Sequence, residues 1–190
     1  MSEPQEPPNS AIRMLWLPVT AMAAIVVVSN IAVQVPINDW LTWGALTYPV
    51  AFMVTDLTNR RFGAGATRRV VYVGFAIAVI LSIWAAGIRI AVASGTAFLA
   101  AQLLDVSIFD RLRRSTLWWR APLTSSLSAS ALDTALFFSL AFAGTGLPWI
   151  TWGLGDFGVK VVMAVALLIP FRALMRFVSP TAMNAGQHTA

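Results

Sequence analysis

Asp133 is the residue whose position in this sequence most strongly suggests chemistry. It lies about 12 residues into an apolar stretch from 121 to 143, or about 18 Å along a helix. The 4-3 spacing of Ser126, Ser130 and Asp133 places them on one helical face. An ionisable group at the centre of a bilayer costs roughly 2.5–3.5 kcal/mol, so it normally faces a partner or a wet cavity. The spacing favours a functional carboxylate with Ser130 beside it, and the alternative is a carboxylate that ties two helices together.

A second group of polar residues lies in the apolar stretch 89–110. Gln102 and Asp105 are three residues apart and share a helical face with Phe98, which lies one turn earlier. Gln102 is uncharged and deeper in the stretch, so it is the better candidate for ligand binding. Asp105 lies closer to the end, where the alternative is a salt bridge to Arg111.

Asp56 and Asn59 close the apolar stretch 41–57. The sequence around them, TDLTNRRFG, is unusually polar for the end of such a stretch. It predicts a binding role for both residues. The alternative is a solvated helix end in which Asp56 pairs with Arg60 or Arg61.

The two basic residues inside apolar stretches are Lys160 and Arg89. Lys160 follows Asp156 by four residues, which is the spacing of an ion pair on one helix. In the alternative, Lys160 is the charge partner of Asp133 or of Arg89 across a helical bundle. Both basic residues are therefore candidates for the site.

These residue types together suit the binding of a small, planar and mostly uncharged ligand. Aromatic rings stack on such a ligand, and amides and carboxylates bind its hydrogen-bonding edge. The sequence has no cysteine and one histidine, His188, in a polar tail. It therefore predicts no catalytic residue, no metal site and no cofactor, and an enzyme is not expected.

The amino-acid composition indicates the kind of fold in which these residues lie. Of the 190 residues, 58% are hydrophobic and 11% are charged, against about 25% charged in a soluble domain. We predict an all-α fold, a polytopic bundle of six transmembrane helices in residues 13–178, with disordered cytoplasmic termini at 1–12 and 179–190. A tight hairpin between Gly87 and Arg89 separates the third and fourth spans. The six spans are expected at 13–35, 41–57, 69–88, 89–110, 121–143 and 157–177.

The net charge of +5 is explained by membrane topology rather than by nucleic acid binding. Arginines concentrate in every second connection, so both termini are expected on the cytoplasmic side, next to anionic lipid. The sequence leaves a homo-oligomer open. The basic residues that define this orientation are Arg60, Arg61, Arg68, Arg69, Arg111, Arg113, Arg114, Arg120, Arg172 and Arg176.

From Trp43 to Pro170 the chain resembles the queuosine precursor transporter family, also described as vitamin-uptake-like. The resemblance implies a six-helix protein of the bacterial inner membrane that imports 7-cyano- or 7-aminomethyl-7-deazaguanine. It also implies similarity to the substrate-binding subunits of energy-coupling-factor transporters. All the charged and amide candidates above fall within its blocks. The blocks are TWGALTYP (42–49), TDLTNRRFG (55–63), RIAVAS (89–94), QLLDVSIFDRLR (102–113), WWRAPLTSS (118–126), LDTALFF (132–138) and DFGVKV.

Two functional hypotheses follow. The first is a transporter of small molecules that works alone, by facilitated diffusion or by proton coupling. The second is a binding subunit that needs separate ATPase partners, because the chain has no phosphate-binding Walker motif.

Overall fold

The computed structural model describes residues 15–32, 35–38, 41–86 and 88–178, so the predicted disordered termini lie outside it. Within this part the fold is a helical bundle, which agrees with the all-α prediction. Its two short strands form an antiparallel pair in which Pro36 faces Thr42 and Asn38 faces Leu41. The elements are α2 (Trp16–Ala32), β1 (Pro36–Asn38), β2 (Leu41–Thr42), α3 (Trp43–Thr47), α4 (Val50–Ala86), α5 (Ile88–Leu112), α6 (Arg120–Phe142), α7 (Trp149–Ala166) and α8 (Leu168–Met175).

Four helical stretches of the described chain are long and apolar enough to cross a membrane. They are Trp43–Leu81, Ile88–Leu112, Arg120–Phe142 and Trp149–Met175, and Trp16–Ser29 is a shorter apolar helix. A hydrocarbon core of about 30 Å needs about 20 helical residues. The chain is therefore a multi-pass membrane protein.

Helix α4 is broken at Gly63, where the chain reverses its direction. Gly63 has φ 81° and ψ 170°, a backbone conformation that is essentially restricted to glycine. The residues on both sides of Gly63 are helical, so the connection predicted between 57 and 69 is wrong in extent. The arginines on either side of Gly63 favour a loop when only the sequence is considered. In the structure they lie on two helices that meet at this one residue.

Replacing Gly63 with alanine should destabilise the protein by about 1–3 kcal/mol, because a Cβ atom disfavours this φ and ψ. The matched control is Gly65→Ala. Gly65 is helical and a Cβ atom there would meet nothing within 4 Å, so alanine should be neutral or slightly stabilising. Thermal unfolding of the two purified variants in detergent measures the difference. Equal unfolding midpoints for the two variants would mean that a side chain at position 63 causes no backbone strain.

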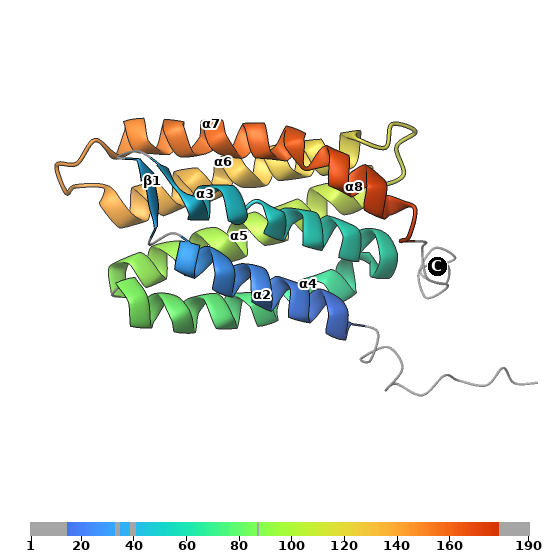
Figure 1. Cartoon of the computed structure of the whole chain (residues 1–190), viewed down its shortest axis with the longest axis horizontal. Helices are drawn as coiled ribbons and strands as arrows, with labels where there is room; N and C mark the ends of the chain where they lie inside the picture. Colours follow the sequence, from blue (N-terminus) through green and yellow to red (C-terminus); the bar gives the residue numbers. More distant parts are fainter. Residues whose placement is uncertain (1–14, 33–34, 39–40, 87, 179–190) are drawn as a thin grey trace, which may run out of the picture.

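Helix α5 lies at the centre of the bundle. It packs against α4 on one side and α6 on the other, while α2 packs on α4 and α7 packs on α6 (Figure 1). The contact between α2 and α4 is especially close, because a Cβ atom on Gly74 would lie 2.7 Å from Met22 Cγ. Small residues allow such close approach of helices in lipid. The central position of α5 explains why Gln102 and Asp105 are buried.

The last membrane stretch consists of two helices, since α7 ends at Ala166 and α8 begins at Leu168. Pro170 accounts for the break: it has no N–H to donate to the carbonyl of Ala166. Helix α7 begins at Trp149, so the loop predicted from 144 to 156 is shorter and the span predicted from 157 starts too late.

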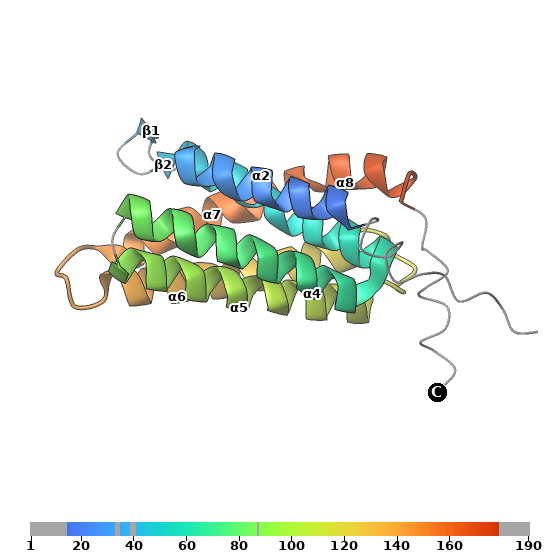
Figure 2. The ribbon, with the colours of Figure 1, turned by 90° about the horizontal axis from the view of Figure 1, so that it is seen from below.

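The turns alternate between the two ends of the bundle. Figures 1 and 2 show one end of the bundle, which holds the start of α2, the bend of α4, the connection between α5 and α6, and α8. The opposite end holds the strands and the connection between α6 and α7. Helix α4 ends at Ala86 and α5 begins at Ile88, which confirms the predicted tight hairpin, although Gly87 itself is outside the described residues.

Candidate functional site

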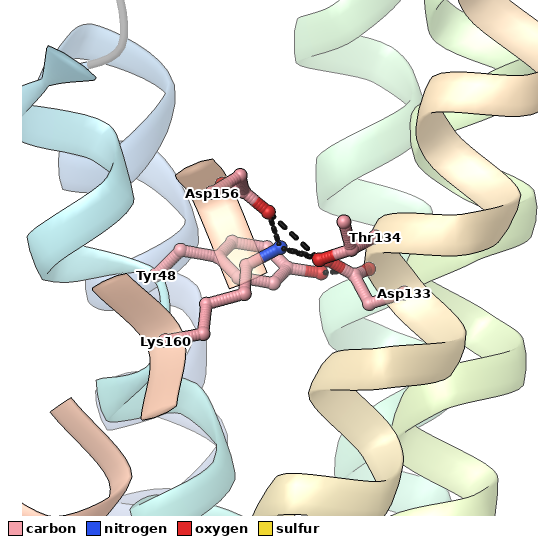
Figure 3. Close-up of polar contacts among 5 residues, drawn as sticks. All are labelled: Tyr48, Asp133, Thr134, Asp156 and Lys160. Carbon is pink, nitrogen blue, oxygen red and sulfur yellow. Dashed lines mark hydrogen bonds and ion pairs between the residues drawn. The ribbon is translucent and has the colours of Figure 1, made fainter. Parts of the chain in front are cut away.

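Lys160 is buried at the centre of a polar cluster formed by α6, α7 and the turn between α3 and α4. Its Nζ lies 2.7 Å from Asp133 Oδ2 and 2.5 Å from Asp156 Oδ2. It also donates a hydrogen bond to Thr134 Oγ1 at 3.1 Å, and that hydroxyl donates to Asp156 Oδ2 at 2.8 Å (Figure 3). Tyr48 completes this lysine cluster, because its hydroxyl lies 3.4 Å from Asp133 Oδ1.

Lys160 makes both the contact with Asp156 and the contact with Asp133 that were predicted as alternatives. The side chain pairs with Asp156 on its own helix and with Asp133 on α6 at the same time. Lys160 and Asp133 are each 5% exposed, so these charges are held almost without water. A buried ion pair is stable only when its partners satisfy each other, so removing one partner is far more damaging than removing both.

An aromatic layer adjoins the lysine cluster. The ring of Tyr48 packs edge-on against Phe52 on α4, with ring centres 6.3 Å apart, and against Phe98 on α5, at 6.2 Å. Phe52 lies one turn before Asp56, and Phe98 lies one turn before Gln102. The aromatic layer therefore separates the lysine cluster from a second polar group further along α4 and α5.

This second group, the carboxyl cluster, is buried where α4, α5 and α6 meet. Thr55 donates to Asp105 Oδ2 at 2.9 Å, and Ser125 donates to Asp56 Oδ1 at 3.3 Å. The two carboxyl groups also lie next to each other. They offer neighbouring acceptor oxygens to a ligand that carries neighbouring N–H groups. The carboxyl cluster consists of Thr55, Asp56, Asn59, Gln102, Asp105 and Ser125.

Several polar atoms of the carboxyl cluster have no hydrogen-bond partner within the described part of the chain. They are both amide atoms of Gln102, Oδ1 of Asp105 and Oδ1 of Asn59. Gln102 is 0% exposed. A buried polar group without a partner costs about 1–3 kcal/mol, so such groups mark places where a ligand or an ordered water completes the bonding.

Neither structural alternative for the carboxylates of this cluster holds. The ion pairs between described residues are those of Arg113 with Asp110 and of Lys160 with Asp133 and Asp156. Among these pairs of described residues, Asp105 makes none with Arg111, and Asp56 makes none with Arg60. Both carboxylates face the interior of the bundle instead.

Arg89 lies apart from both clusters. It is exposed at the start of α5, where Nε donates to the carbonyl of Leu140 at 3.2 Å and Nη2 donates to that of Ala143 at 2.8 Å. These bonds satisfy free carbonyls at the end of α6. By contrast, Ser130 is buried on α6, one turn from Asp133.

A narrow cleft reaches the carboxyl cluster from the end of the bundle that holds α8. Its cavity volume is about 10 Å³, far below the roughly 300 Å³ of a small ligand pocket. Asp56 and Ser126 line it on one side. Passage of a ligand through this cleft therefore requires it to widen. Its lining consists of Met53, Asp56, Pro122, Ser126, Ala164, Leu167, Leu168 and Phe171.

Five polar residues of the two clusters are not among the site residues that the sequence predicts. Thr55, Ser125 and Thr134 supply hydroxyls, and a hydroxyl in an apolar helix is also satisfied by its own backbone. Asp156 lies next to a predicted helix end, where polar groups are common, and Tyr48 lies inside the predicted span 41–57, where an aromatic ring is also typical of packing. The signal that marks Thr55 is its place next to Asp56, one turn before Asn59.

Comparison with known proteins gives a consistent result. Residues 42–88 and 81–175 match the family described as "Putative vitamin uptake transporter". The chain is 34% identical to a "Probable queuosine precursor transporter" of Haemophilus influenzae, covering 77% of this chain and 79% of that protein. It is 31% identical to the "Queuosine precursor transporter" of Escherichia coli, covering 85% and 86%. No solved structure gives a significant match. Both polar clusters lie within the matched residues.

Proposed function

This chain belongs to the family of vitamin uptake and queuosine precursor transporters, and on that premise we propose that it imports queuosine precursors of the 7-deazaguanine type. It is a transporter and not an enzyme. The proposed substrates are 7-cyano-7-deazaguanine and 7-aminomethyl-7-deazaguanine. The membrane is proposed to be the inner membrane of a bacterium.

The proposed topology has six crossings with both termini in the cytoplasm. In this topology the break at Gly63 would divide the long stretch from Trp43 into two antiparallel crossings, and α2 would supply another. Helices α5 and α6 supply one each, and α7 with α8 supplies the last. Most of the arginines lie in or near the segments at one end of the bundle, which supports assigning that end to the cytoplasm.

Gln102 provides the main support for the proposed substrate-binding site. Its amide offers one donor group and one acceptor in a buried site, and both lack partners among the described residues. A guanine-like edge presents a ring N–H and an exocyclic amine beside a carbonyl oxygen. The carboxyl groups of Asp105 and Asp56 would accept from the two N–H groups, and the Gln102 amide would donate to the carbonyl. Asn59 Oδ1 is a further acceptor at this edge.

The aromatic layer and the lysine cluster would bind the rest of the substrate. Phe98 and Phe52 offer ring surfaces on which a planar base can stack. Asp133, with Ser130 one turn away, would contact the substrate from the side opposite Gln102. Lys160 holds Asp133 in position for this contact. Arg89 is proposed to act near the extracellular entrance, because it lies at the end opposite α8.

An uptake experiment tests this proposal. Cells that make neither precursor and lack their own importer are given the gene of this chain and nanomolar 7-cyano- or 7-aminomethyl-7-deazaguanine. Queuosine in their tRNA is then measured. We expect queuosine to appear with the wild-type chain and to be absent with the empty vector. Absence of queuosine despite correct membrane insertion would reject the proposed substrates.

Proteoliposomes that contain the purified chain alone distinguish it from a binding subunit of an energy-coupling-factor transporter. We expect labelled precursor to equilibrate across the vesicle membrane without an ATPase. Binding without any entry into the vesicle lumen would favour the binding subunit.

A further inference from the structure

Three arginines from separate parts of the chain come together beside the cleft. Arg60 is on α4, Arg113 follows the end of α5, and Arg172 is on α8. Arg113 and Arg172 are close enough to Arg60 for their charges to repel it. Two further contacts fix this arrangement. Arg113 Nη1 donates to the carbonyl of Asn59 at 3.2 Å, and the Arg172 guanidinium lies 5.0 Å from the ring centre of Trp118.

The charge of this arginine triad is not balanced by the described residues around it. Arg113 forms an ion pair with Asp110 at 2.9 Å. Arg60 forms none with a described residue, and its buried Nε lacks a hydrogen-bond partner there. Asp56, one turn before Arg60, bonds to Ser125 instead. Within the described part of the chain, the triad therefore carries three positive charges against one paired carboxylate.

We propose that Arg60, Arg113 and Arg172 form a binding site for a phosphate group. Guanidinium groups bind phosphate through paired N–H donors, and three of them offer more donors than one phosphate can use. A phosphate would supply the partner that Arg60 Nε lacks and would remove the repulsion within the triad. The phosphate belongs either to the headgroup of an anionic lipid or to a free phosphate ion.

A phosphate bound at the triad would act on the neighbouring cleft. Arg172 lies next to Phe171, which lines the cleft from α8, and Phe171 packs on Phe109 of α5 at 6.2 Å. Helix α8 is joined to α7 at a break and lines the cleft with Leu168 and Phe171, so a shift of α8 relative to α7 would widen the cleft. A phosphate bridging α8 to α4 would hold the cleft narrow. This inference does not depend on the identity of the transported substrate.

The test measures binding directly, with the full chain purified in detergent. Native mass spectrometry follows titration with phosphatidylglycerol, with phosphatidylcholine of the same acyl chains, and with inorganic phosphate. Arg60→Gln is compared with Arg69→Gln, which removes the same charge from an exposed position on α4. We expect Arg60→Gln to weaken phosphate binding about tenfold, the loss of one charge-assisted contact, and Arg69→Gln to change it less than twofold.

The outcomes separate the two sources of phosphate. Saturable binding of phosphatidylglycerol that depends on Arg60 identifies a lipid site, and the same dependence with inorganic phosphate alone identifies a site for the free ion. Equal losses in the two variants, or no saturable binding of either, would overturn the proposal. Arg60→Lys serves if Arg60→Gln does not fold. It keeps the charge without the paired donors, so it should bind more weakly than the wild type, and wild-type affinity would count against the site.

Discussion

Replacing Lys160 with methionine is expected to destabilise the protein by about 3–5 kcal/mol and to abolish uptake, because it leaves the buried carboxylate of Asp133 and the partly buried one of Asp156 without their cation. Asp133 and Asp156 both lie within 2.7 Å of the ammonium in the wild type. Methionine has a similar length and no charge, so packing changes little. Thermal unfolding in detergent and uptake in cells measure the two effects.

A neutralised variant is the control for this prediction. Lys160→Met combined with Asp133→Asn and Asp156→Asn removes the whole set of charges. Its stability should return to within about 1–2 kcal/mol of the wild type, since replacing a complete buried ion pair is often nearly neutral. Its uptake should stay low if Asp133 contacts the substrate. A single Lys160→Met variant that unfolds at the wild-type temperature would show that the lysine cluster does not stabilise the bundle.

Replacing Gln102 with leucine is expected to change stability and uptake in opposite directions. The substrate-free protein should gain about 1–3 kcal/mol of stability, because two buried amide atoms without described partners are removed. Uptake should fall about 10- to 100-fold, the equivalent of one or two lost hydrogen bonds to the substrate. Unfolding in detergent without substrate and initial uptake rates provide the two measurements.

Ser107→Ala is the matched control on the same helix. The Ser107 hydroxyl already donates to the carbonyl of Leu103 at 2.7 Å, so its removal should leave uptake unchanged. A Gln102→Leu variant that is less stable than the wild type would mean that the amide is a structural group. A more stable variant with normal uptake would mean that the substrate binds elsewhere.

Apolar length and the placement of arginines predicted where the apolar helices run. They predicted less well where those helices end, as Gly63 and Trp149 show. A polar sequence such as TNRRFG fits both a loop and two helix ends that project arginines into water, and composition alone does not distinguish them. The backbone conformation at Gly63 does, because only one residue leaves the helix.

Membrane insertion and the apolar stretches that contain polar residues are readable from the sequence, because both follow from the local order of apolar and charged residues. Which of these polar residues contact one another follows from the packing of the helices. Asp133 reaches Lys160 across 27 positions, and Thr55 reaches Asp105 across 50. Such contacts depend on how each helix is rotated and crossed against its neighbours, and a rotation of 100° per residue gives one sequence many possible faces. The same packing leaves the Gln102 amide without a described partner, which no spacing in the sequence could predict.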